Sequence, residues 1–127
     1  MRDQPPAEVM PEIARTVYRT IYRRGADRTG LLRALFFEVT GLAPDTEEAA
    51  REAIGKVVAT VMIYLGTQMS EGRLRTMHPM LALQSFIGPI FFHVITRAAA
   101  ERVLGLDIEG EQAMTELAET WLRAMKP

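Results

Sequence analysis

Hydrophobic positions recur at helical spacing along most of the chain and predict five helices and no strand. In the first of these patterns Val9, Ile13, Val17 and Ile21 follow one another every four residues, and arginines occupy the opposite face. Prolines, glycines or polar residues separate one pattern from the next, and the connections are short. We therefore expect one compact all-α domain over residues 1–127. The predicted helices cover residues 7–24, 27–40, 45–70, 79–104 and 107–125.

Capping residues support several of these boundaries. Asp45 and Glu48 have the spacing of a capping box at the start of the third helix. His78 stands where the N-cap of the fourth helix belongs, immediately before a proline at the first helical position. Gly105 follows the last apolar residue of that helix, which predicts a glycine C-cap. The last helix is expected to start from Asp107.

The fourth helix, residues 79–104, is apolar on every face near its middle. A surface helix normally has one apolar stripe, and this one lacks the uninterrupted apolar length of a membrane span. We therefore expect protein to cover both sides, with its own domain on one side and a second chain on the other. Gly88-Pro89 removes a helical hydrogen bond and predicts a kink. One strip of the helix contains Met80, Gln84, Ile87, Phe91, Ile95 and Ala98, and its neighbour contains Leu81, Ser85, Gly88, Phe92, Thr96 and Ala99.

The third helix is predicted to be the buried central helix of the domain. Between Val57 and Leu65 its only polar side chains are those of Thr60 and Tyr64. Single polar groups within apolar strips are typical of a pocket that binds an apolar ligand and orients it with a few hydrogen bonds. We therefore expect a pocket between this helix and the kinked fourth helix.

Composition and charge narrow the function classes. The 127 residues carry a net charge of -1, so no basic field for nucleic acid is present, and cytoplasmic location is the default for a chain without signal segment or span. The chain has no cysteine, which excludes thiolate metal sites and cysteine catalysis. His78 and His93 are too far apart along one helix to share a metal ion. No nucleophile-base pair or phosphate loop is visible, so we expect neither an enzyme nor a cofactor.

The order of elements and several local sequences resemble the C-terminal regulatory domain of TetR-family transcriptional repressors. The stretch from Tyr64 to Pro79, with its Gly-Arg-Leu-Arg exit, looks like the family's long helix and the start of the next one. The segment from Ser85 to Phe92, followed by a tail helix, is similar to the family's dimerisation helices. The resemblance implies a homodimer held by a four-helix bundle, and an internal pocket for a small apolar or amphipathic effector. The family's DNA-binding head is absent from this chain, so contact with DNA is expected only through such an N-terminal head.

Two sets of candidate residues follow. The ligand-binding set is Tyr64, Met62, Gln84, Phe91, Phe36, Arg33 and His93. The dimer-interface set is Leu81, Ser85, Gly88, Phe92, Thr96, Leu117, Trp121 and Leu122. Ordinary core packing is an alternative explanation for the apolar members of both sets. His93 could instead be a packed histidine with a single hydrogen bond, and Arg33 could form an ion pair with Glu38.

These features predict a ligand-sensing and homodimerisation domain of a TetR-like repressor, without membrane or metal. The alternative is a structural helical dimerisation module with a filled core and no ligand. A small carrier of apolar molecules is a third interpretation. Cavity volume separates the first two, because glycines and alanines allow either close packing or space for a ligand.

Overall fold

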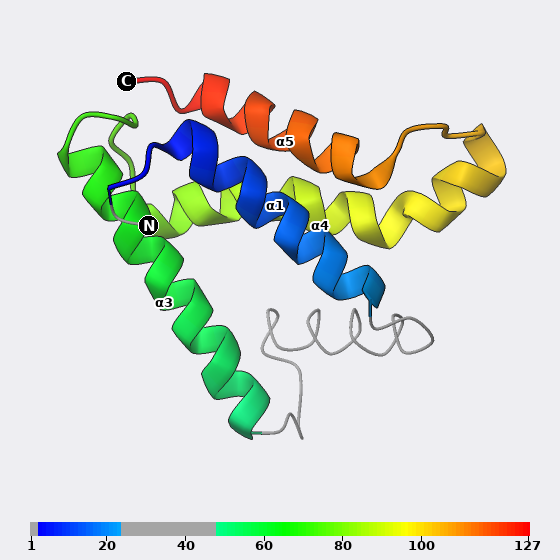
Figure 1. Ribbon diagram of the computed structural model, residues 1–127, viewed down its shortest axis with the longest axis horizontal. Helices are drawn as coiled ribbons and strands as arrows, with labels where there is room; N and C mark the ends of the chain where they lie inside the picture. Colours follow the sequence, from blue (N-terminus) through cyan, green and yellow to red (C-terminus); the bar gives the residue numbers. More distant parts are fainter. Residues whose placement is uncertain (1–2, 24–47) are drawn as a thin grey trace.

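The computed structural model describes residues 3–23 and 48–127, and the regular elements of this part of the chain are helices, without strands. Its helices are α1 (Pro6–Arg23), α3 (Glu48–Ser70), α4 (Pro79–Leu104) and α5 (Gly110–Ala124) (Figure 1). The all-α prediction is confirmed for these residues. The predicted helix at 27–40 and the predicted start of the third helix at 45–47 lie outside the described residues.

The four described helices pack in two pairs, which are joined through α4. α1 lies along α5, and α3 packs against α4 (Figure 1). α4 also contacts both α1 and α5, so it joins the two pairs. The largest fully buried side chains come from all four helices, and they are Met10, Leu65, Gln68, Phe86, Ile90 and Met114. One continuous core therefore holds these helices together.

Trp121 connects α5 to α4 through both packing and hydrogen bonding. Its ring meets Phe86 edge to face, with ring centroids 5.3 Å apart. Its indole N–H donates to the Ser85 hydroxyl at 2.9 Å and to the carbonyl of Ala82 at 3.3 Å. The buried indole thus has the polar partner that its N–H requires.

Helix ends follow the capping residues closely. The Nδ1 atom of His78 accepts a hydrogen bond from the backbone N–H of Met80 at 3.1 Å, which confirms the predicted N-cap. Gly105 ends α4 with a φ of 65°, the left-handed conformation that favours glycine. α5 begins later than predicted because Glu109, rather than Asp107, accepts the first free N–H groups, those of Glu111 and Gln112.

The prediction of a buried central helix is wrong for part of α3. Among the side chains of α3 that the structure describes, the buried ones are Val61, Tyr64, Leu65, Gln68 and Met69. Val57 and Ile63 are 63% and 70% exposed. The reason is geometric, because α3 diverges from α1 toward its own N-terminal end (Figure 1). Apolar residues of this helix therefore lie at the surface as well as in the core.

α4 is the one helix in the described part of the chain that is long and apolar enough to cross a membrane by length and composition. The sequence predicted that α4 lacks the uninterrupted apolar length of a membrane span. The helix is nevertheless long and apolar enough, although its sequence contains the polar residues Gln84, Ser85 and His93. One face of α4 is apolar because it packs into the core, through Ala82, Leu83, Phe86, Ile90 and Val94.

Candidate ligand groove and dimer surface

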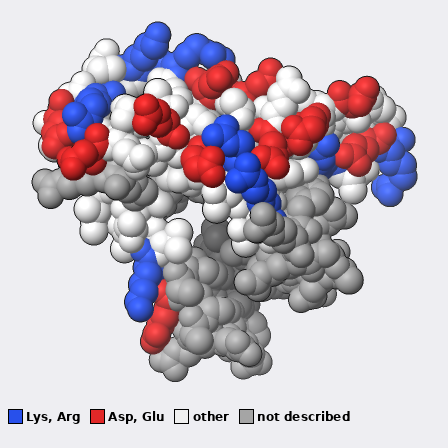
Figure 2. All heavy atoms as spheres, viewed as in Figure 1, with Lys and Arg blue, Asp and Glu red and all other residues white. Residues whose placement is uncertain are grey.

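A groove of about 600 Å³ lies between α1 and α3. α3 approaches the start of α1 where the Tyr64 hydroxyl donates a hydrogen bond to the backbone carbonyl of Gln4, which precedes α1, at 2.8 Å. From there they diverge, and the molecular surface is hollowed between them (Figure 2). Its volume is within the range of small-molecule sites, which is roughly 300–1,000 Å³.

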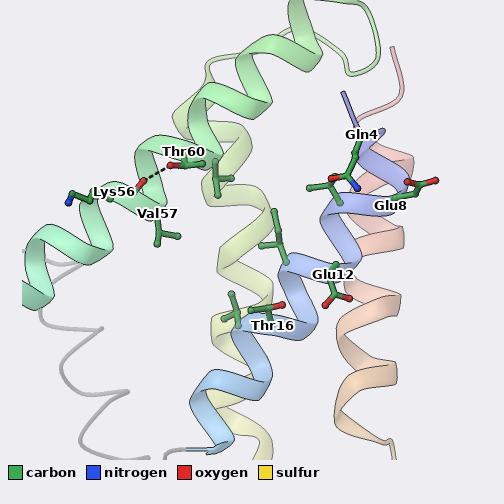
Figure 3. A pocket seen from close by; sticks show the side chains of 11 residues that line it. Gln4, Glu8, Glu12, Thr16, Lys56, Val57 and Thr60 are labelled. Atoms are coloured by element: carbon green, nitrogen blue, oxygen red, sulfur yellow. Dashed lines mark hydrogen bonds between the residues drawn. The ribbon is translucent and has the colours of Figure 1, made fainter. Parts of the chain in front are cut away.

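The walls of the groove are mainly aliphatic. α1 contributes Val9, Ile13 and Val17, and α3 contributes Val57 and Val61. Figure 3 shows Val57 turned toward α1 across the groove. Neutral polar groups complete the lining, from Gln4, Thr16 and Thr60. The Thr60 hydroxyl donates to the carbonyl of Lys56 at 2.8 Å, so it retains its capacity to accept a hydrogen bond.

The charged residues at the edge of the groove are either paired or directed outward. Glu12 binds Arg15 at 3.0 Å and Arg19 at 3.5 Å. The hydrogen bond from Arg15 is the main reason why the pKa of Glu12 lies below its ordinary value. Glu8 and Lys56 extend away from the space between the helices (Figure 3). Apart from Glu8, Glu12 and Lys56, the described residues that line the groove are apolar or neutral polar.

The predicted ligand residues do not converge on this groove. Tyr64 is 3% exposed and lies in the core, where burial raises the pKa of its hydroxyl. Met62, Phe91 and His93 are partly buried, and none of them lines the groove. Gln84 was expected on a buried face but is exposed, because α4 turns the opposite face to the core. Arg33 and Phe36 lie outside the described residues.

His93 belongs to a polar cluster at the C-terminal end of α4. Its Nε2 lies 3.1 Å from Nη1 of Arg97, whose Nη2 donates to the carbonyl of Ile108 at 2.5 Å. Arg97 also pairs with Glu101 at 2.8 Å. This arrangement matches the alternative of a packed histidine with one hydrogen bond, and it ties the connector before α5 to α4.

The other face of α4 forms an exposed apolar strip, which we call the α4 strip. Its members are Leu81, Gly88, Phe92, Ile95, Ala99 and Val103, all exposed. Phe92 is 66% exposed and Val103 72%. No other residue lies within 4 Å of a Cβ placed on Gly88, so the middle of the strip is open. The described part of the chain therefore leaves this strip uncovered, and three of its members, Leu81, Gly88 and Phe92, belong to the predicted dimer interface.

Not every predicted interface residue belongs to this surface. Ser85 is exposed beside the strip, and Thr96 is partly buried, with its hydroxyl donating to the carbonyl of Phe92 at 2.7 Å. Trp121 is only 5% exposed and packs in the core, because its ring fills the space beside Phe86. Leu117 and Leu122 pack against the same core and are partly buried. The exposed face of α5 is instead polar and charged (Figure 2), with Gln112, Glu116, Glu119, Thr120 and Arg123.

The sequence matches no family model, and neither a curated protein nor a solved structure matches it. Within the described residues no group of three or more histidine, aspartate or glutamate side chains is arranged to hold a metal ion. The function is therefore inferred from two features of the molecule, the groove between α1 and α3 and the α4 strip.

The groove was missed from the sequence for a specific reason. Val9, Ile13 and Val17 recur at helical spacing, which is the same signal that a core-facing stripe gives. The groove arises because α3 diverges from α1, and residues that line it, such as Val9 and Val61, also belong to the core. The same divergence leaves Val57 exposed, although it belongs to an apolar stretch of α3.

Proposed function

We propose that this chain is the ligand-sensing and homodimerisation domain of a TetR-like transcriptional repressor. The observation that carries the proposal is that α4 is apolar on two opposite faces, one buried in the core and one exposed as the α4 strip. A contiguous exposed apolar surface of this kind is typical of a protein–protein interface. In this role the domain would act in the cytoplasm, and DNA would be bound by a separate N-terminal head.

A second copy of the same chain fits the α4 strip better than a charged partner does. In a two-fold symmetric dimer the same surface faces itself, so a charge close to the symmetry axis would meet a like charge. The α4 strip has no charged member. Arg97, in the C-terminal half of α4, is turned inward, and only 11% of its side chain is exposed. Gly88 near the middle of the strip removes a side chain where two helices would cross, which allows a close approach.

The groove between α1 and α3 supports the sensing half of the proposal. It is open, of ligand size, and bordered by α3, which packs directly on α4. A ligand that changes the separation of α1 and α3 would bias the arrangement of α4 and hence of the dimer. Such coupling requires that the ligand bind the two arrangements with different affinity.

Sedimentation of three forms of the chain at micromolar concentration tests the proposal. We expect the wild-type chain to be a dimer, with more than about 1,200 Å² of total surface buried. Phe92→Asp should be a folded monomer, because it places a carboxylate in the middle of a dry interface. Gln112→Asp adds the same charge on the exposed polar face of α5 and should remain a dimer. A wild-type chain that sediments as a monomer would refute the dimerisation half.

A further inference from the structure

We propose that the groove between α1 and α3 binds a neutral molecule with an aliphatic chain. The inference rests on the proposed sensing function and specifies its ligand class. It is drawn from the side chains that line the groove and from the placement of the charges around it.

The apolar walls favour an aliphatic over an aromatic occupant. Five of the lining residues that the structure describes are valine or isoleucine, and none of these described lining residues is phenylalanine, tyrosine or tryptophan. An aromatic ligand would therefore find no ring to stack against. A flexible hydrocarbon chain can follow the wedge between two diverging helices and bury its methylene groups against branched side chains on both sides, at about 0.8 kcal/mol for each buried CH₂.

The charges argue for a neutral occupant. Glu12 is held by Arg15 and Arg19, so it offers no free carboxylate to a cationic group. Glu8 and Lys56 extend outward (Figure 3), so neither faces an ion lying between the helices. An ionic head group buried here would lose its hydration without gaining a partner of opposite charge.

The neutral polar lining suits a ligand with a hydroxyl group at one end. The Thr60 hydroxyl donates its hydrogen bond to the Lys56 carbonyl, so its oxygen can accept a hydrogen bond from a ligand O–H. The side-chain amide of Gln4 can both donate and accept. A long-chain alcohol can supply the donor and the acceptor that these groups need.

A series of decyl compounds tests the inference by calorimetric titration of the full chain, with the two ionic surfactants below their micellar concentrations and 1-decanol below its solubility limit. The probes are 1-decanol, decyl sulfate and decyltrimethylammonium, with 1-naphthol as a neutral aromatic probe. We expect 1-decanol to bind most tightly and to raise the melting temperature. The Val57→Asn variant should weaken its binding about fivefold, because a branched wall is replaced by an amide.

Ile63→Asn is the matched control. Ile63 is on the same helix, is similarly exposed and does not line the groove, so its substitution should leave the affinity for 1-decanol within about twofold of wild type. Both positions are exposed, so both variants should fold.

The possible failures are distinguishable. Tighter binding of decyl sulfate, decyltrimethylammonium or 1-naphthol, still weakened by Val57→Asn, would overturn the ligand class and leave the groove as the sensing site. If none of the probes binds in a way that depends on Val57, both the ligand class and the sensing half of the proposed function fail. The dimerisation half is tested separately by sedimentation.

Discussion

Gly110 is a residue at which a single added carbon should have a large effect. It is buried at the start of α5, and a Cβ placed there would overlap the ring and hydroxyl of Tyr18 on α1. The ring must shift or α5 must move away from α1 to accommodate it. We expect Gly110→Ala to lower the free energy of unfolding by about 1–3 kcal/mol, measured by urea denaturation.

Gly55 and Gly66 provide the controls for this substitution. Both lie within α3, and a Cβ on either would meet no other residue within 4 Å. Alanine there should raise stability by about 0.5–1 kcal/mol, because it restricts the unfolded chain and favours the helix. Equal stability of Gly110→Ala and the wild-type chain would show that Tyr18 does not hold the position found here.

His93 should make the stability of the fold depend on pH. Burial, followed by the positive charge of Arg97, lowers the pKa of His93 below its ordinary value of 6.5, and Glu101 opposes the shift. Protonation would set a second cation against Arg97, so the neutral ring is the form that fits the cluster.

The sign of the effect follows from the lowered pKa. The folded chain binds fewer protons at this site than the unfolded chain, so the stabilisation is fully present above pH 6.5 and is lost as pH falls through the lowered pKa. Urea unfolding at a series of pH values measures it. His93→Gln, which keeps an acceptor but cannot titrate, should flatten the dependence in that window. An unchanged pH profile in this variant would contradict the assignment.

At the scale of elements, the core rather than the ion pairs should hold α1 against α5. Met114 is fully buried, whereas the Arg19–Glu111 pair at 2.6 Å has both side chains more than a third exposed. We therefore expect Met114→Ala to cost about 2–5 kcal/mol of unfolding free energy, measured by urea denaturation. Arg19→Gln should have a much smaller effect, because solvent screens an exposed pair. A larger loss in Arg19→Gln would reverse this assignment.

Helix boundaries could be predicted well where a single residue sets them. His78 and Gly105 act through their own side chain or backbone conformation, so local sequence was sufficient to place both ends of α4. The exposure of Gln84 and of Val57 could not be predicted in this way. Both positions belong to apolar sequences, and which face of an apolar helix meets the core depends on where the other helices lie.

At the scale of the whole molecule, the candidate interface could be predicted in part and the groove could not. The strip through Leu81, Gly88 and Phe92 was recognisable from its spacing, because small and apolar residues recur along one line of a single helix. The groove requires two helices that diverge, which is a tertiary property without a local signal. Trp121 shows the same limit, since an apolar residue of the tail helix fits a core and an interface equally well by sequence.

Dimerisation through the α4 strip should couple folding to protein concentration. If the folded state is a dimer and the unfolded state a monomer, mass action favours folding as the concentration rises. A tenfold increase is worth about 1.4 kcal/mol per dimer, and we expect it to raise the melting temperature by about 2–4 °C. Scanning calorimetry over two decades of concentration measures this shift. Phe92→Asp should remove the concentration dependence, and Gln112→Asp should retain it. A wild-type melting temperature that stays constant with concentration would show that the α4 strip is not covered by a second copy of the chain.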